Sequence, residues 1–107
     1  MFEGWPDGRT LRVFDPPRPP VVVDMVRFDP TSGRPYSAAP EGVSLRVRAS
    51  GARIEAAMPA RQLAWLQLSN GLWRGICEMQ LRSANRTSSM TITLWVPPEA
   101  IQVQEEQ

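Results

Sequence analysis

The segment 72–82, LWRGICEMQLR, brings the single cysteine of the chain close to a carboxylate and two arginines. A cysteine nucleophile must ionise to a thiolate, which an adjacent base or a positive field promotes. The chain has no histidine, the commonest general base. On an extended strand, Cys77 shares its side with Gly75 and Met79, while Glu78 points to the other side. We therefore expect Cys77 to be a buried and inert strand residue.

Carboxylates offer a second chemistry, because paired Asp and Glu side chains support acid–base or metal reactions. Asp24 is the most interesting of them, since it interrupts an apolar run and must reach solvent or a partner such as an arginine. No phosphate-binding glycine motif, nucleophile elbow or metal-ligand spacing is present. We predict no catalytic residue, no metal and no cofactor, and an enzyme with carboxylate chemistry is an unsupported alternative. The carboxylates considered are Asp15, Asp24, Asp29, Glu55 and Glu78.

All twelve basic side chains are arginines, and the net charge of +1 hides their uneven distribution. Residues 42–96 carry seven arginines against only Glu55 and Glu78. Guanidinium groups bind phosphates and carboxylates well, so a cluster of them is an anion-binding candidate. The local excess is modest, which makes nucleic-acid binding possible but less favoured than protein binding. The anion-binding candidates are Arg46, Arg48 and Arg53.

Length and composition indicate one globular domain spanning 1–107. An apolar fraction of 42% and a charged fraction of 21% are near the globular average and argue against wholesale disorder. A lone cysteine cannot form an intramolecular disulfide, and the first ten residues do not resemble a signal peptide. Uninterrupted apolar runs are far shorter than the roughly 20 residues of a membrane span. We therefore expect a cytoplasmic protein that does not bind membranes.

The first half of the chain reads as two strands separated by loops. Residues 9–14 predict a short strand, and 21–28, rich in β-branched residues, predict another. The Pro-rich connector 15–20 has too few amide donors for a helix or a central strand. Residues 29–42 read as a long loop, and 104–107 as a frayed acidic tail.

Residues 43–49 and 52–58 flank Ser50-Gly51, a plausible two-residue hairpin turn. Pairing around this turn places apolar residues on one face and Arg46, Arg48 and Arg53 on the other. Residues 59–69 are ambiguous, because they contain good helix formers and a proline suited to a first helical turn. The following Asn70-Gly71 fits both a helix C-terminus and a hairpin turn. We expect a short helix there, with a strand as the alternative.

Residues 72–82 and 89–96 form the clearest predicted hairpin, joined by the polar loop 83–88. Apolar residues alternate in both strands, so their inner faces match throughout. The expected pairs are Leu81 with Met90, Met79 with Ile92, and Cys77 with Leu94. The same register places Trp95 opposite Ile76 on the outer, otherwise polar face. A tryptophan there either packs under another element or forms a binding patch for a partner.

These observations predict a mainly β fold, a small antiparallel barrel or sandwich of about five or six strands with one short helix. An α+β fold is the alternative. The leading function is a small non-enzymatic protein-binding module, such as an inhibitor, adaptor or assembly component. Trp95 and Ile76 are its candidate contacts with a protein partner or a second copy. The alternatives are a nucleic-acid-binding domain that uses the arginine cluster, and an enzyme.

Overall fold

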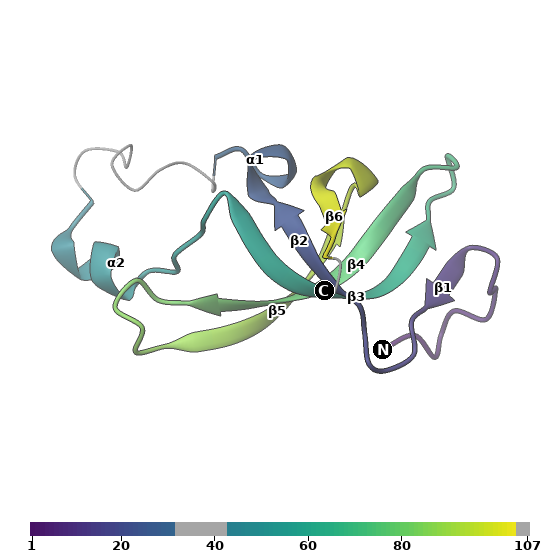
Figure 1. Cartoon of the computed structure of the whole chain (residues 1–107), viewed down its shortest axis with the longest axis horizontal. Helices are drawn as coiled ribbons and strands as arrows, with labels where there is room; N and C mark the ends of the chain where they lie inside the picture. The colour runs from purple at the N-terminus through teal and green to yellow at the C-terminus, as the bar shows by residue number, and fades with distance from the viewer. Residues whose placement is uncertain (32–42, 105–107) are drawn as a thin grey trace.

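One long strand, β3 (Ala57–Gln67), runs through the middle of a single antiparallel sheet (Figure 1). The computed structural model describes residues 1–31 and 43–104. Within them, six strands lie in the order β5-β4-β3-β2-β6, with β1 also paired to β3. The mainly β prediction is confirmed, and the sheet is not closed into a barrel. The other strands are β1 (Leu11–Val13), β2 (Pro20–Asp24), β4 (Trp73–Arg82), β5 (Ser89–Val96) and β6 (Ile101–Val103).

The Pro-rich connector leaves the sheet over residues 15–19, because its prolines cannot donate hydrogen bonds to β3, and Pro20 already belongs to β2. β1 and β2 lie end to end along one edge of β3, and the connector joins them. The backbone N–H of Phe14 donates to Leu63 O at 2.9 Å, and that of Gln62 donates to Pro19 O at 3.0 Å. The pairing of β3 with β4 shifts between Gln62 and Ala64, which marks a bulge at the same place. The connector therefore fills the space between two pairing segments of one strand.

The core lies against one face of the sheet, here called the inner face. Short turns of helix, α1 (Met25–Phe28) and η2 (Pro98–Ala100), contribute Met25 and Ala100 to it. Burial of such apolar side chains contributes roughly 1.5–3 kcal/mol each. Cys77 belongs to this cluster and is fully buried. The strand residues of the cluster are Val21, Val23, Met58, Ala60, Cys77, Met79 and Val96.

The β4–β5 hairpin has the predicted register at every pair. Leu81 lies opposite Met90, and Met79 opposite Ile92. Cys77 lies opposite Leu94. The strict alternation of apolar residues fixes this register, because a slip of one residue would expose the whole apolar row.

The strand predicted over 21–28 ends at Asp24, and α1 follows it. The Asp24 carboxylate accepts hydrogen bonds from the backbone N–H groups of Val26 (3.1 Å) and Arg27 (3.3 Å). It also lies 3.5 Å from the Arg27 guanidinium. An aspartate is favoured at a helix N-cap because it satisfies free amide groups of the first turn. The Asp24 carboxylate therefore has two kinds of partner, the free backbone N–H groups in the first turn of α1 and the Arg27 guanidinium.

The hairpin predicted over 43–58 is wrong, because 45–50 form the helix α2 (Leu45–Ser50). The Ser44 hydroxyl accepts a hydrogen bond from Val47 N–H at 3.2 Å, as N-cap serines do. The second half of the predicted hairpin pairs elsewhere, with Ala52 bridging to Ser83. Leucine and arginine are good helix formers, so local propensity and the serine cap outweighed the alternation.

The helix predicted over 59–69 is also wrong, and the strand alternative is right. Hydrogen bonding to strands on both edges outweighs the helix propensity of this segment. Asn70-Gly71 forms the turn of the β3–β4 hairpin, with Gly71 at φ 89°. The Asn70 side chain accepts a hydrogen bond from Leu72 N–H at 3.1 Å.

Two predicted segments reach beyond the described residues. The long loop 29–42 is described only up to residue 31, and the tail 104–107 only at residue 104. In the part of the chain that the structure describes, no helix has the length and apolar character needed to cross a membrane.

The side chain of Ile101 from β6 packs against Gly75 of β4, so a side chain at position 75 should be costly. A Cβ atom at this position would overlap Ile101 Cδ1 and lie 3.2 Å from Gln62 Nε2. We expect Gly75→Ala to lower the free energy of unfolding by about 1–3 kcal/mol in urea titrations. Ile101→Val removes the clashing methyl group, so it should restore part of the loss in the double variant.

Gly8→Ala is the matched control, because a Cβ at Gly8 meets no atom within 4 Å. This control should unfold like the unmodified protein. Wild-type stability of Gly75→Ala would contradict the close packing of β6 on the inner face.

Candidate functional site

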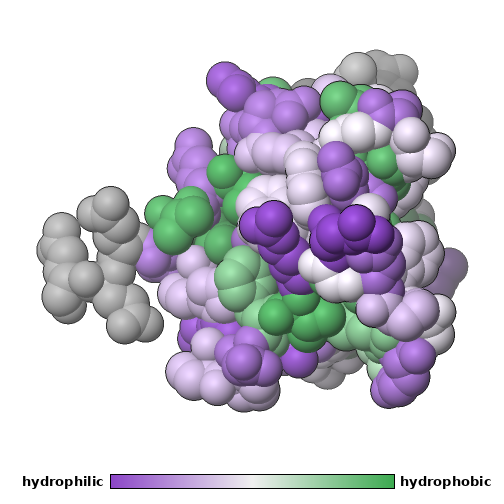
Figure 2. Space-filling model, turned by 90° about the vertical axis from the view of Figure 1, so that its right-hand side faces the viewer, coloured by the Kyte–Doolittle hydropathy of each residue, from purple (hydrophilic) through white to green (hydrophobic). Residues whose placement is uncertain are grey.

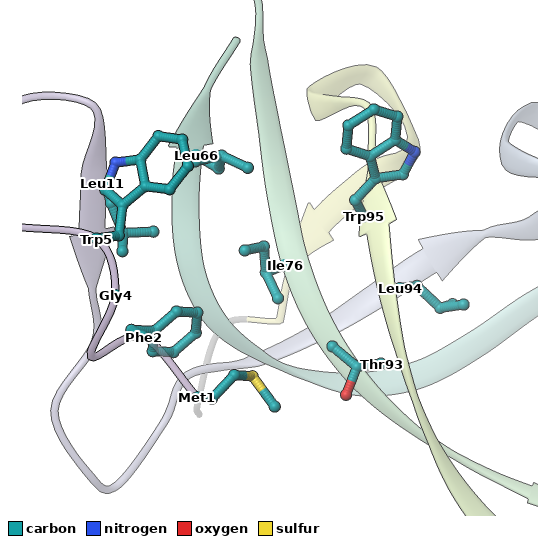
Figure 3. A pocket seen from close by; sticks show the side chains of 10 residues that line it. All are labelled: Met1, Phe2, Gly4, Trp5, Leu11, Leu66, Ile76, Thr93, Leu94 and Trp95. Carbon is teal, nitrogen blue, oxygen red and sulfur yellow. The ribbon is translucent and has the colours of Figure 1, made fainter.

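An apolar pocket of about 570 Å³ opens on the outer face of the sheet (Figure 3). Phe2 and Trp5 of the N-terminal segment 1–5 line one side, and Trp95 of β5 lies on the other. Leu66 and Ile76, from β3 and β4, lie between them. On the side of the molecule that carries β1 and the N-terminus, hydrophobic surface lies between strongly hydrophilic residues (Figure 2). We call this space the apolar pocket.

The β4–β5 register brings the two predicted contact residues together. Ile76 and Trp95 are directly paired across the strands, as expected. Trp95 is 56% exposed, so no described element covers it. Residues directly opposite on neighbouring strands have Cβ atoms about 5 Å apart, so the two side chains form one continuous apolar surface.

The N-terminal segment is folded against β1 by several hydrogen bonds. Trp5 Nε1–H donates to Thr10 Oγ1 at 3.0 Å, and Trp5 N–H donates to Phe2 O at 3.1 Å. Asp7 O accepts from Leu11 N–H at 3.2 Å. These bonds hold Phe2 and Trp5 beside the sheet, so the segment forms a wall of the apolar pocket.

An arginine stands at the rim of the apolar pocket. The guanidinium carbon of Arg74 lies 5.8 Å from the centroid of the Trp95 ring. Its Nη1 donates a hydrogen bond to Trp73 O at 2.9 Å. Cation–π contact at an exposed site contributes about 0.5–1 kcal/mol and restricts the ring. Trp95 is thus oriented while most of its surface stays open to solvent.

The sequence analysis selected only Ile76 and Trp95 from the lining of the apolar pocket, and it missed Leu66 because it assigned β3 to a helix. As a strand, β3 places Ala64 opposite Ile76 and Leu66 opposite Arg74. Leu11 of β1 pairs in turn with Leu66. The Asn70-Gly71 hairpin signal that follows this segment could have shown the strand. No pattern in the first five residues pointed to a pocket wall.

The single cysteine lies in the core of the protein. Cys77 is fully buried in the inner-face cluster, and burial raises the pKa of its thiol to about 11. The thiolate is therefore strongly disfavoured at neutral pH. Glu78, its neighbour in sequence, is exposed on the outer side and lies opposite Arg61.

The arginine candidates do not share a hairpin face. Arg46 and Arg48 belong to α2, and Arg53 follows in an extended segment. The Nε of Arg53 lies 3.5 Å from a carboxylate oxygen of Glu55. Arg53 instead joins arginines that the sequence analysis did not select. They line a second, larger hollow of about 980 Å³, here called the arginine groove, and are Arg53, Arg61, Arg82 and Arg86.

The carboxylate candidates do not form one cluster, and only Glu55 and Glu78 line a common hollow. Asp24 caps α1, and Asp29 ends it. Asp15 is exposed in the Pro-rich connector. Glu55 and Glu78 both line the arginine groove. Among the described residues, no three metal-ligating carboxylate, thiol or imidazole groups gather at one place.

Comparison with known proteins gives no relative to guide the assignment, because no family model, curated protein or solved structure matches the chain. The interpretation therefore depends on the two outer-face surfaces.

Cys77 should react with thiol reagents only when the protein unfolds. We expect slow labelling of the native protein at pH 8 and fast labelling in denaturant, since the native thiol is both covered and protonated. Rapid native labelling would show that the inner face opens.

The raised pKa also predicts a pH dependence of stability. Above pH 8.5 the unfolded thiol ionises, whereas the native thiol stays neutral until about pH 11. The contribution of the neutral Cys77 thiol to the free energy of unfolding is complete below the pKa of the thiol in the unfolded chain. It is lost as the pH rises above that value. The difference in unfolding free energy between wild type and Cys77→Ala should therefore shrink from pH 8 to pH 10 in urea titrations. If the difference in unfolding free energy between wild type and Cys77→Ala stays constant from pH 8 to pH 10, the pKa of the native thiol is not raised.

Proposed function

We propose that this protein is a small non-enzymatic protein-binding module that uses the apolar pocket to hold a side chain of its partner. The partner is another protein or a second copy of the chain. The observation that carries the proposal is the 56% exposed Trp95 facing an open apolar space lined by Phe2 and Trp5. A large aromatic group left in water has a free-energy cost that a partner removes by covering it.

The composition of the apolar pocket supports this proposal. Tryptophan and arginine are enriched among the residues that dominate protein-protein binding energy. Trp95 carries Arg74 over its ring, which restricts the side chain before a partner arrives. A surface ordered in advance loses less conformational entropy on binding. The pocket volume of about 570 Å³ suits one or two apolar side chains of a partner.

The other two functions have weaker support. An enzyme would need convergent catalytic groups, and the carboxylates have the structural or groove positions given above. Nucleic-acid binding is less well supported because the hairpin face predicted for Arg46, Arg48 and Arg53 does not form. In the described part of the chain, the lining of the apolar pocket is uncharged, and Arg74 at its rim is engaged with the Trp95 ring and with Trp73 O. The proposal places the chain in the cytoplasm, because a lone buried thiol suits a reducing compartment.

Trp95→Ala should weaken association while leaving the fold intact. The pocket loses its largest exposed side chain, so we expect about 2 kcal/mol of binding energy to be lost, roughly 30-fold in affinity. Self-association is measured by sedimentation velocity over a range of concentrations. Binding of other proteins is measured by quantitative mass spectrometry of material retained from native-host extract.

Leu72→Ala is the matched control, because Leu72 is similarly exposed (53%) but lies in the β3–β4 turn outside the apolar pocket. This control should retain the same proteins in the same amounts as wild type. An equal loss of binding in Trp95→Ala and Leu72→Ala, or no loss in Trp95→Ala, would show that the apolar pocket is not the binding site. Unfolding of Trp95→Ala would show that the residue is part of the core.

A further inference from the structure

The arginine groove continues the outer face of β4 beyond the apolar pocket. Side chains alternate along this strand, and Ile76, which lines the apolar pocket, is followed on the same side by Glu78, Gln80 and Arg82. All three line the arginine groove. At about 3.3 Å per residue, Ile76 and Arg82 are roughly 20 Å apart along β4. A single extended segment of a partner is long enough to contact both surfaces.

The groove is positively charged and its arginines are accessible. All four arginines are exposed, against the two carboxylates of Glu55 and Glu78. Glu55 pairs with Arg53. Among the described residues, Arg61, Arg82 and Arg86 form no ion pair. Three guanidinium groups along one hollow are an electrostatic complement for several negative charges.

Hydrogen bonds order the segments that carry the groove arginines. Arg53 N–H donates to Arg82 O at 2.9 Å, which ties the segment before β3 to the end of β4. Arg86 follows in the turn of the β4–β5 hairpin, where Asn85 Oδ1 accepts from Thr87 N–H at 3.2 Å. Arg61 Nη1 donates to Arg18 O at 3.0 Å. The positive groups are therefore presented by structured backbone.

We infer that the arginine groove binds an acidic, extended segment of the protein partner whose apolar side chain enters the apolar pocket. Among the described residues, the groove lining contains no aromatic side chain on which a base could stack. Glu55 and Glu78 would repel the unbroken charge of a phosphate backbone, whereas a peptide can place neutral residues beside them. These features favour carboxylates of a polypeptide over a nucleic acid. The inference rests on the proposed function, because it names the chemistry of that partner.

The test uses a fluorescein-labelled peptide of about twelve residues in which glutamate and serine alternate, with glutamine replacing glutamate in the reference peptide. Fluorescence anisotropy with the full chain should show binding of the glutamate peptide that weakens with salt, and at least about tenfold weaker binding of the glutamine peptide. The double variant Arg82→Gln with Arg86→Gln should weaken glutamate-peptide binding by about tenfold or more.

The control variant is Arg9→Gln with Arg46→Gln, which removes the same two charges outside the groove. It should bind the glutamate peptide like wild type, and circular dichroism should show the same melting for all variants. Equal effects of the two double variants, or equal binding of the two peptides, would overturn the inference. Tighter binding of a single-stranded oligonucleotide of similar length would overturn it in favour of nucleic acid.

Trp95→Ala separates failure of this inference from failure of the proposed function. The alternating glutamate peptide has no apolar side chain for the pocket, so Trp95→Ala should bind it like wild type. In the native-host extract experiment, one outcome is that proteins are retained by wild type and by the Arg82→Gln with Arg86→Gln variant but lost from Trp95→Ala. That result would support the apolar pocket as a protein-binding site and would overturn the inference of an acidic segment.

Discussion

The pairing of β3 along both of its edges is the constraint on which the rest of the structure depends. One edge pairs with β4, and the other pairs first with β2 and then with β1. The bulge between Gln62 and Ala64 changes which residues of β3 face the core, at the point where the connector loops out. A bulge reorients the side chains that follow it. Leu66 consequently joins Ile76 on the outer face and helps to build the apolar pocket.

Sequence patterns predicted the β4–β5 hairpin well, because the information that specifies it is local. In the β4–β5 hairpin, alternation and a polar turn specify one register, and both Cys77 and Trp95 lie where that register places them. Residues 57–67 were harder, since their composition favours a helix, whereas pairing with β4 on one edge and with the distant β2 and β1 on the other makes them a strand. The same error concealed Leu66 as a pocket residue. It also hid the position of Arg61 beside β4, and Arg53 reaches the end of β4 only through a distant backbone hydrogen bond to Arg82.

The two outer-face surfaces follow from one strand. β4 buries Cys77 and Met79 on its inner side and presents Ile76, Glu78, Gln80 and Arg82 on the other. The side chains on the inner side of β4 are therefore used for packing, and those on its outer side remain free to contact a partner. In the proposed function, the apolar anchor provides affinity through burial and the basic groove provides selectivity through charge. This division explains how a chain of 107 residues combines a core with the outer-face surface that we propose as a binding site.

Site-specific photocrosslinking tests the central claim, that the outer face around Trp95 contacts a protein, most directly. Trp95 is replaced by the photoreactive residue p-benzoylphenylalanine, which keeps an aromatic ring in the apolar pocket, and the native host cells are irradiated. The same replacement at Leu72 serves as the control, because both positions are more than half exposed. The account predicts a discrete adduct with a protein, a second copy of this chain included, from position 95 and none from position 72. No adduct from position 95, or adducts of equal yield from both positions, would contradict it.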